Sequence, residues 1–195
     1  MRRISLIMIP GIIAIALFVG LNTFETLSND SATQLSGPQL NFNAYSEGIN
    51  TILYDTDGKI NYTLQAQRQV HYNDDTTELD KPLIRLFQDG ASRWNIVANS
   101  GRISSAESTA ATSVDKIDLL GNVQVYGLDE LGNRTLMFSE FLTLNPDTEI
   151  LETDQAVSVV TQSMEQSSTG MIAKLRQDEI TFLRDIKGRY EQATN

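Results

Sequence analysis

The chain contains few residues that could carry out catalysis. His71 is its only histidine, and cysteine is absent. A Ser-His-Asp site would therefore depend on His71, and no Gly-x-Ser-x-Gly motif is present to hold a nucleophile. His71 also lies on the polar side of a segment in which polar and apolar residues alternate, which favours an exposed strand histidine over a catalytic one. We expect no enzymatic activity and no catalytic residue.

Metal and cofactor sites have equally little support. The absence of cysteine excludes thiolate-bound zinc and iron–sulfur clusters. Residues Asp55 to Gly58 begin like a calcium loop, but the third ligand before the glycine and the distal glutamate are missing. A hairpin turn is the simpler interpretation of Asp57-Gly58. We predict no metal and no cofactor.

The net charge argues against a nucleic-acid partner. The chain has 25 acidic and 15 basic residues, a formal net charge of −10. Nucleic-acid affinity comes largely from Lys and Arg contacts to phosphate. A predominantly acidic chain does not provide them.

The N-terminal segment resembles a membrane anchor. Residues 4–21 form an uncharged apolar run preceded by Arg2 and Arg3. As a helix this run would span about 27 Å, close to a bilayer core. The positive-inside rule then places the N-terminus in the cytoplasm and exports the rest of the chain. We expect residues 1–24 to be a cytoplasmic stub and retained anchor, and residues 25–46 to be a polar linker. A cleaved signal peptide is the alternative, although the only Ala-x-Ala, Ala14 to Ala16, lies inside the apolar run.

The remaining sequence predicts an all-β domain over residues 47–190, with a tail at 191–195. Alternation of period two is clearest between Ile60 and Tyr72. The predicted inward residues are Ile60, Tyr62, Leu64, Ala66, Val70 and Tyr72. The predicted outward residues are Thr63, Gln65, Gln67, Gln69 and His71. Pro82 should stand at a strand start or edge, because it cannot donate to a ladder.

The apolar face of such a sheet must be buried on a second sheet or on a ligand. If two layers stay apart, the space between them is a groove for acyl chains, and if they close it is a core. The alternation alone leaves both open and favours a core. Free sheet edges could also accept a strand from another chain.

Several short motifs, taken in order and spacing, resemble one known family. They are Leu53-Tyr54 with Gly58, Tyr62 to Gln67, Tyr72, Leu79 with Pro82, Trp94 to Ala98, Gly121 to Val125, Leu175-Arg176 and Tyr190-Glu191. Together with the anchor and the acidic β domain, they make the chain similar to the LptC family, single-pass inner-membrane components of lipopolysaccharide transport.

This resemblance implies an open, twisted antiparallel β-jelly roll behind one transmembrane helix, with the domain in the periplasm. It further implies that the domain receives lipopolysaccharide from the ABC transporter LptBFG, passes it to the periplasmic acceptor LptA and serves as its docking site. Family lipid contacts would map onto Thr51, Leu79 and Ile180. A membrane-anchored structural or adaptor domain without lipid ligand stays open as the alternative.

If neighbouring jelly rolls join edge to edge, each end of the domain has a partner of its own. We expect the N-terminal strand, with Ile49, Ile52 and Tyr54, to meet the transporter because it lies nearest the anchor. We expect the C-terminal strands, 171–175 and 179–183, to pair with the acceptor. The residues predicted at this acceptor end are Met171, Ile172, Leu175, Ile180 and Phe182.

Overall fold

The structure, a computed structural model, describes residues 42–104, 116–129 and 132–190. These residues belong to one compact unit, and they form strands and turns together with a single short 3-10 helix. The predicted anchor and residues 25–41 of the predicted linker lie outside the described residues. Among the residues that are described, no helix has the length and apolar character needed to cross a membrane.

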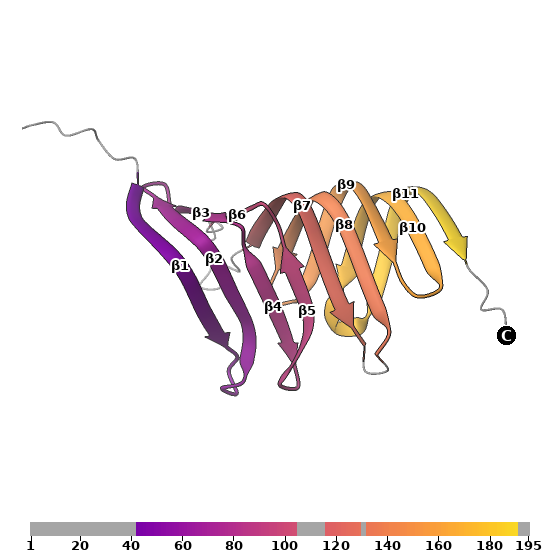
Figure 1. The fold of residues 1–195 in the computed structure, drawn as a ribbon, viewed down its shortest axis with the longest axis horizontal. Helices are drawn as coiled ribbons and strands as arrows, with labels where there is room; N and C mark the ends of the chain where they lie inside the picture. Colours follow the sequence, from indigo (N-terminus) through magenta and orange to yellow (C-terminus); the bar gives the residue numbers. More distant parts are fainter. Residues whose placement is uncertain (1–41, 105–115, 130–131, 191–195) are drawn as a thin grey trace, which may run out of the picture. The chain divides into compact units, whose positions relative to one another are not determined.

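The described chain forms one antiparallel sheet of eleven strands (Figure 1). The strands are β1 (Phe42–Tyr54), β2 (Ile60–Tyr72), β3 (Thr76–Asp80), β4 (Leu83–Gln88), β5 (Ala91–Val97), β6 (Ser100–Ser104), β7 (Lys116–Leu128), β8 (Arg134–Asn145), β9 (Ile150–Val160), β10 (Met164–Lys174) and β11 (Glu179–Tyr190). The 3-10 helix η1 (Leu175–Gln177) separates β10 from β11. The antiparallel all-β class is therefore as predicted, and strand β1 begins five residues before the expected domain boundary.

The sheet divides between β2 and β7. One half of β2 pairs with β4, which pairs with β5 and through it with β7. The other half of β2 pairs with β3, which pairs with β6 and through it also with β7. Pro82 directly precedes β4 at the point where the two routes separate, and its carbonyl accepts a hydrogen bond from the Ala98 N–H. This position confirms the prediction for Pro82.

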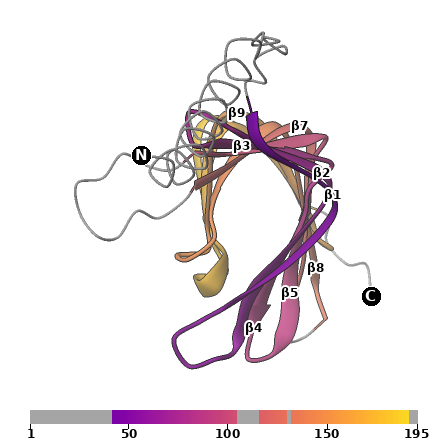
Figure 2. The same cartoon turned by 90° about the vertical axis from the view of Figure 1, so that its left-hand side faces the viewer.

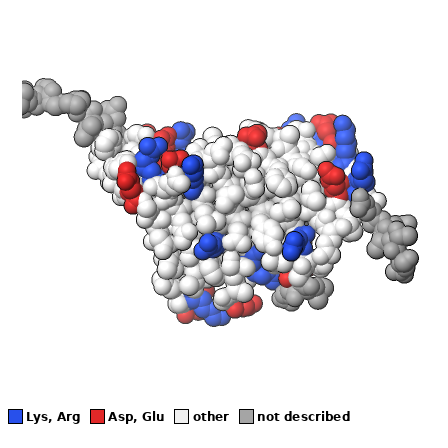
Figure 3. All heavy atoms as spheres, in the orientation of Figure 1, with Lys and Arg blue, Asp and Glu red and all other residues white. Residues whose placement is uncertain are grey.

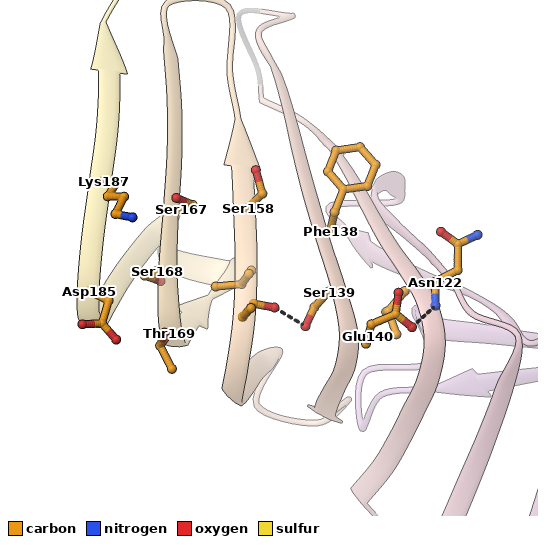
Figure 4. Close-up of a pocket in the computed structure, with 13 residues that line it drawn as sticks. Asn122, Phe138, Ser139, Glu140, Ser158, Ser167, Ser168, Thr169, Asp185 and Lys187 are labelled. Carbon is orange, nitrogen blue, oxygen red and sulfur yellow. Dashed lines mark hydrogen bonds between the residues drawn. The ribbon is translucent and has the colours of Figure 1, made fainter.

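The long strands β7 to β10 bend where the register of their pairing is interrupted. Register shifts interrupt the β7–β8, β8–β9 and β9–β10 ladders. Where the ladder is broken, the Ser139 hydroxyl donates to the Ala156 carbonyl at 2.9 Å (Figure 4). The Ser168 hydroxyl donates to the Gly170 carbonyl, also at 2.9 Å. Gly170 has φ +85°, a conformation that glycine adopts without strain. Bulges of this kind bend a sheet and increase its twist, so the strands fold over instead of lying flat.

The bent sheet encloses one continuous core. Viewed along the length of the domain, its walls curve around a common interior (Figure 2). Apolar side chains from both walls fill it; those with almost no exposed surface include Ile84, Leu86, Ile96, Ile117, Leu119, Val125, Met137, Leu142, Leu144, Leu151, Val159, Met171, Ala173 and Leu175. Packing is tight in the middle, because a Cβ at Gly127 would lie 2.2 Å from the Trp94 ring.

One predicted alternation is wrong beyond the middle of β2. Leu64 and Ala66 are buried, as expected. Further along, however, Gln69 lies opposite Leu79 and His71 lies opposite Thr77, and both of these partners are buried. Directly opposed residues share a face, so Gln69 and His71 take the inward side. Val70 then lies opposite Glu78, and Val70 and Tyr72 belong to the outer face.

Candidate functional site

The inward apolar face continues from the core to both edges of the sheet. In the described part of the chain, β1 pairs only with β2, and β11 only with β10. On β1, Ile49, Thr51 and Leu53 lie opposite Ala66, Leu64 and Tyr62. On β11, Ile180 and Phe182 lie opposite Ala173 and Met171. Each edge strand therefore extends the inward face by one row of side chains.

These outermost rows are accessible, whereas the middle is closed. Ile49 and Leu53 are half-buried, as are Ile180 and Phe182, and Thr51 is exposed. The core residues between the two ends are close to 0% exposed. The inward face is thus open at its two ends and packed between them.

The three predicted lipid contacts all lie on this inward face, but in different surroundings. Thr51 and Ile180 lie on the open edge rows. Leu79 is only 2% exposed and lies in the core. A Cβ at its partner Gly101 would lie 3.5 Å from Leu79. Leu79 also lines a cavity of about 590 Å³ beside Gly101 and Leu120, but a ligand there would meet little of its surface.

The three residues predicted at the transporter end do not share a face. Ile49 points inward, whereas Ile52 lies opposite Thr63 on the outer face and is 45% exposed. Tyr54, at the end of β1, is 61% exposed and lines a cavity of about 630 Å³ between hairpin turns. What these three residues share is their position on the edge strand β1. They do not share one face of the sheet.

At the predicted acceptor end, β10 and β11 have different surroundings. This strand pairs with β9 on one side and with β11 on the other, so its backbone groups are already used. Met171 and Leu175 are fully buried, and Ile172 lies on the outer face opposite Thr181. Only β11, with Ile180 and Phe182, is placed at a free edge. Met171 and Leu175 are buried in the chain as it stands, and their contact with a partner stays a prediction.

Charged side chains gather at the two ends of the domain and along its lower part (Figure 3). At the β1–β3 end, the Tyr72 hydroxyl donates to Glu78 at 2.9 Å, and Arg102 contacts the same carboxylate at 3.2 Å. The hydrogen bond to Glu78 is the largest cause that raises the pKa of Tyr72, and a bond to Glu47 does the same for Tyr45. These tyrosines remain neutral hydrogen-bond donors at physiological pH.

A polar cluster that the alternation of polar and apolar residues did not predict lies at the lower rim of the domain, where β4, β8 and β10 end. The side chain of Glu149, which is 2% exposed, accepts hydrogen bonds from Gln88 at 2.7 Å and from Arg176 at 2.9 Å. Nearby, Arg93 and Asp178 form an ion pair at 3.3 Å. Glu149 follows an Asn-Pro-Asp-Thr turn and has φ +54°. A turn glutamate ordinarily points into solvent, so nothing in the sequence marks this one as buried.

The described residues offer little for catalysis or metal binding. His71 is 2.9 Å from the Thr77 hydroxyl, but its other ring nitrogen is 4.0 Å from Asp75, beyond hydrogen-bonding distance. Across the described ranges, no cluster of three His, Asp or Glu side chains could hold a metal ion. The hollow of about 500 Å³ at the bend contains Ser139 and Ser168, whose hydroxyls already bond backbone carbonyls.

A long antiparallel sheet, bent around an apolar interior and open at both edges, is the architecture that the sequence resemblance implied. A family model described as "Lipopolysaccharide-assembly, LptC-related" matches residues 11–191, which is all but the first ten and last four residues. The chain belongs to the LptC family. No curated protein matches it. Membership in the LptC family gives the chain a role in lipopolysaccharide assembly and transport, within a family of transport components generally associated with the inner membrane.

Proposed function

We propose that this LptC-family chain receives lipopolysaccharide from the transporter LptBFG and passes it to the acceptor LptA, while residues 4–21 hold it in the inner membrane. The observation that supports this proposal is the course of the inward apolar face, which reaches both free edges of the sheet and is accessible at each. The domain thereby has an entry row at β1 and an exit row at β11.

The physical requirement is that acyl chains move without meeting water. Each CH₂ group exposed to water costs about 0.8 kcal/mol. A neighbouring jelly roll that adds its own strand to β1 or β11 would continue the inward face from one protein into the next. The partners would then share one apolar surface, and the lipid would slide along it. We assign the transporter to β1 and LptA to β11.

Photo-crosslinking in intact membranes tests lipid contact. A photoreactive residue at Thr51 or Ile180 should crosslink lipopolysaccharide. Each has a matched control beside it on the same strand, because Ile52 and Thr181 point to the outer face. Crosslinks that are equally strong at the inward and outward positions would contradict transport along the inward face.

The membrane anchor has its own test. The mature protein should keep residues 4–21 and remain in the inner-membrane fraction after carbonate washing. A mature N-terminus between Leu21 and Gln39 would instead identify a cleaved signal peptide.

Dense packing in the middle of the domain favours one other candidate, an adaptor with a closed core and no lipid ligand. Ile84, Leu119 and Leu142 are 0% exposed and leave no room for an acyl chain as they stand. Analysis of the purified protein for bound acyl chains and phosphate separates the two. Lipid that co-purifies in a fixed ratio supports transfer, and its consistent absence supports the adaptor.

A further inference from the structure

The polar cluster at the lower rim connects parts of the sheet that would be far apart if the sheet were flat. Gln88 ends β4, and Glu149 precedes β9. Three strands, β5, β7 and β8, separate β4 from β9 in the sheet order. At about 4.8 Å per strand, β4 and β9 would lie roughly 19 Å apart in a flat sheet. The Gln88 amide nitrogen is nevertheless 2.7 Å from the Glu149 carboxylate. This hydrogen bond therefore joins the wall of the bent sheet that contains β4 to the wall that contains β9, across the opening between them.

A second contact spans the same opening. Arg93 lies on β5, and Asp178 follows η1 at the end of β10, again with three strands between β5 and β10. Their side chains meet at 3.3 Å, and that of Arg93 is only 14% exposed. In the view along the domain, the gold coil after β10 and the tips of β4 and β5 lie on opposite sides of the opening (Figure 2).

The Glu149 carboxylate is the centre of this arrangement. Gln88 donates to one of its oxygens, and the Arg176 guanidinium donates through two nitrogens to the other at 3.2 and 2.9 Å. The Glu149 carbonyl also accepts the Leu175 N–H at 2.9 Å. A carboxylate that is 2% exposed is stable only while such partners remain, because a buried unpaired charge is costly. We therefore expect this contact to be either fully formed or fully broken.

From this geometry we propose that Gln88, Glu149 and Arg176, with Arg93 and Asp178, form a clasp that holds the two walls together and controls lipid entry into the packed interior. The proposal rests on the proposed function, because it supplies the step by which a closed core becomes a groove. Polar groups suit this purpose, since they can exchange their partners for water when the walls separate, whereas apolar contacts cannot.

The decisive variant removes both charges of the central pair. Glu149→Gln with Arg176→Gln leaves no buried unpaired charge, so the fold is retained while the clasp is weakened. The matched control is Lys116→Gln with Glu152→Gln. This control removes an ion pair of 2.9 Å whose two side chains are about half exposed, without touching the opening.

The width of the opening can be measured without lipid. The chain has no native cysteine, so spin labels can be placed at Asp89→Cys and Asp147→Cys, two exposed turn residues that line the rim cavity. In the full-length protein in nanodiscs, the clasp variant should give a longer and broader label-to-label distance than the wild type. Emission from Trp94, the only tryptophan and now 5% exposed, should shift to the red.

Uptake of fluorescent lipopolysaccharide by the same samples tests the control of entry. We expect the clasp variant to take up lipid roughly tenfold faster, the factor that corresponds to about 1.4 kcal/mol, and the Lys116/Glu152 control to match the wild type. A reducible thiol cross-linker between residues 89 and 147 should stop uptake, and reduction should restore it.

An unchanged label distance in the clasp variant would overturn the clasp. An opened variant that takes up lipid at the wild-type rate would overturn its control of entry while leaving lipid transfer intact. If neither protein takes up lipid, the proposed function and the control of entry fail together, and the label distance alone still decides whether the clasp holds the walls.

Discussion

The two free edges of the sheet differ in charge and in support. β1 carries a single charged residue, Glu47, among its thirteen residues, and nearly all of its side chains are exposed. β11 carries five charged residues among twelve, namely Glu179, Arg184, Asp185, Lys187 and Arg189. Charges on an edge protect it against unwanted strand pairing. We infer that β1, which lacks that protection, suits a lasting partner and that β11 suits a partner that binds and leaves.

Strand breaking at each edge should give the largest effects, and opposite ones. Proline removes a backbone donor and fixes φ, so it disrupts an added strand. Ile52→Pro should abolish transporter binding and spare acceptor binding, and Ile180→Pro should do the reverse. We expect losses of about 100-fold, or about 2.7 kcal/mol, in pull-down or surface-binding titrations.

The matched controls are Ile52→Val and Ile180→Val, which keep a β-branched side chain and should bind nearly as the wild type does. Loss of transporter binding in Ile180→Pro, with acceptor binding intact, would reverse the assignment of the two edges.

A charge should affect the middle and the end of the inward face differently. Leu79 is 2% exposed, so Leu79→Asp buries a carboxylate without a partner and should reduce the free energy of unfolding by about 3 kcal/mol or more. Ile180 is half-buried at the edge, and Ile180→Asp should lower lipid crosslinking with a smaller loss of stability. Urea unfolding and crosslinking on the same samples separate the two.

Gln65→Asp provides the control for this pair. Gln65 lies on the outer face, where its amide donates to Asn50 at 3.3 Å, and its replacement should change little. A loss of crosslinking as large as that in Ile180→Asp would show that inward and outward residues are reversed on β2.

Two glycines test the difference in packing between the middle and the end. A methyl group at Gly127 would lie 2.2 Å from the Trp94 ring, whereas at Gly188, on β11, its nearest neighbour would be 3.8 Å away. Gly127→Ala should cost about 1–3 kcal/mol, and Gly188→Ala should be nearly neutral. Thermal unfolding measures both. A neutral Gly127→Ala would mean that the middle is loosely packed and already has room for a ligand.

Strand positions could be read from the sequence because the period-two pattern is local. Tyr62, Leu64 and Ala66 alternate whether or not their neighbours are known. The bend could not be read, because the change of face after Ala66 depends on the strands that pair with β2. The burial of individual side chains could not be predicted from the sequence either. Met171 and Ile180 look alike in sequence, and only their order in the sheet makes one a core residue and the other an edge residue.

The clasp was the least predictable feature. Gln88 and Glu149 are 61 positions apart, and Arg176 is a further 27 along the chain. Residues so distant meet only because the sheet bends. The sequence contained each side chain but no periodic signal that connects them.

The smallest predicted effect distinguishes the two ends by pH. Tyr72, near β1, donates to Glu78, and this bond raises the pKa of Tyr72 above its ordinary value of 10.0. In the unfolded chain the tyrosine loses its proton near pH 10, while in the folded chain it keeps it to higher pH. The stabilisation is therefore complete below pH 10 and is lost as the pH rises through the folded value. The urea midpoint of the wild type should fall with rising pH in this window, and that of Tyr72→Phe should fall less. Glu78→Gln, which removes the carboxylate that accepts from Tyr72, should reduce the slope as Tyr72→Phe does. An identical slope in Tyr72→Phe would show that the Tyr72–Glu78 contact does not stabilise the β1 end.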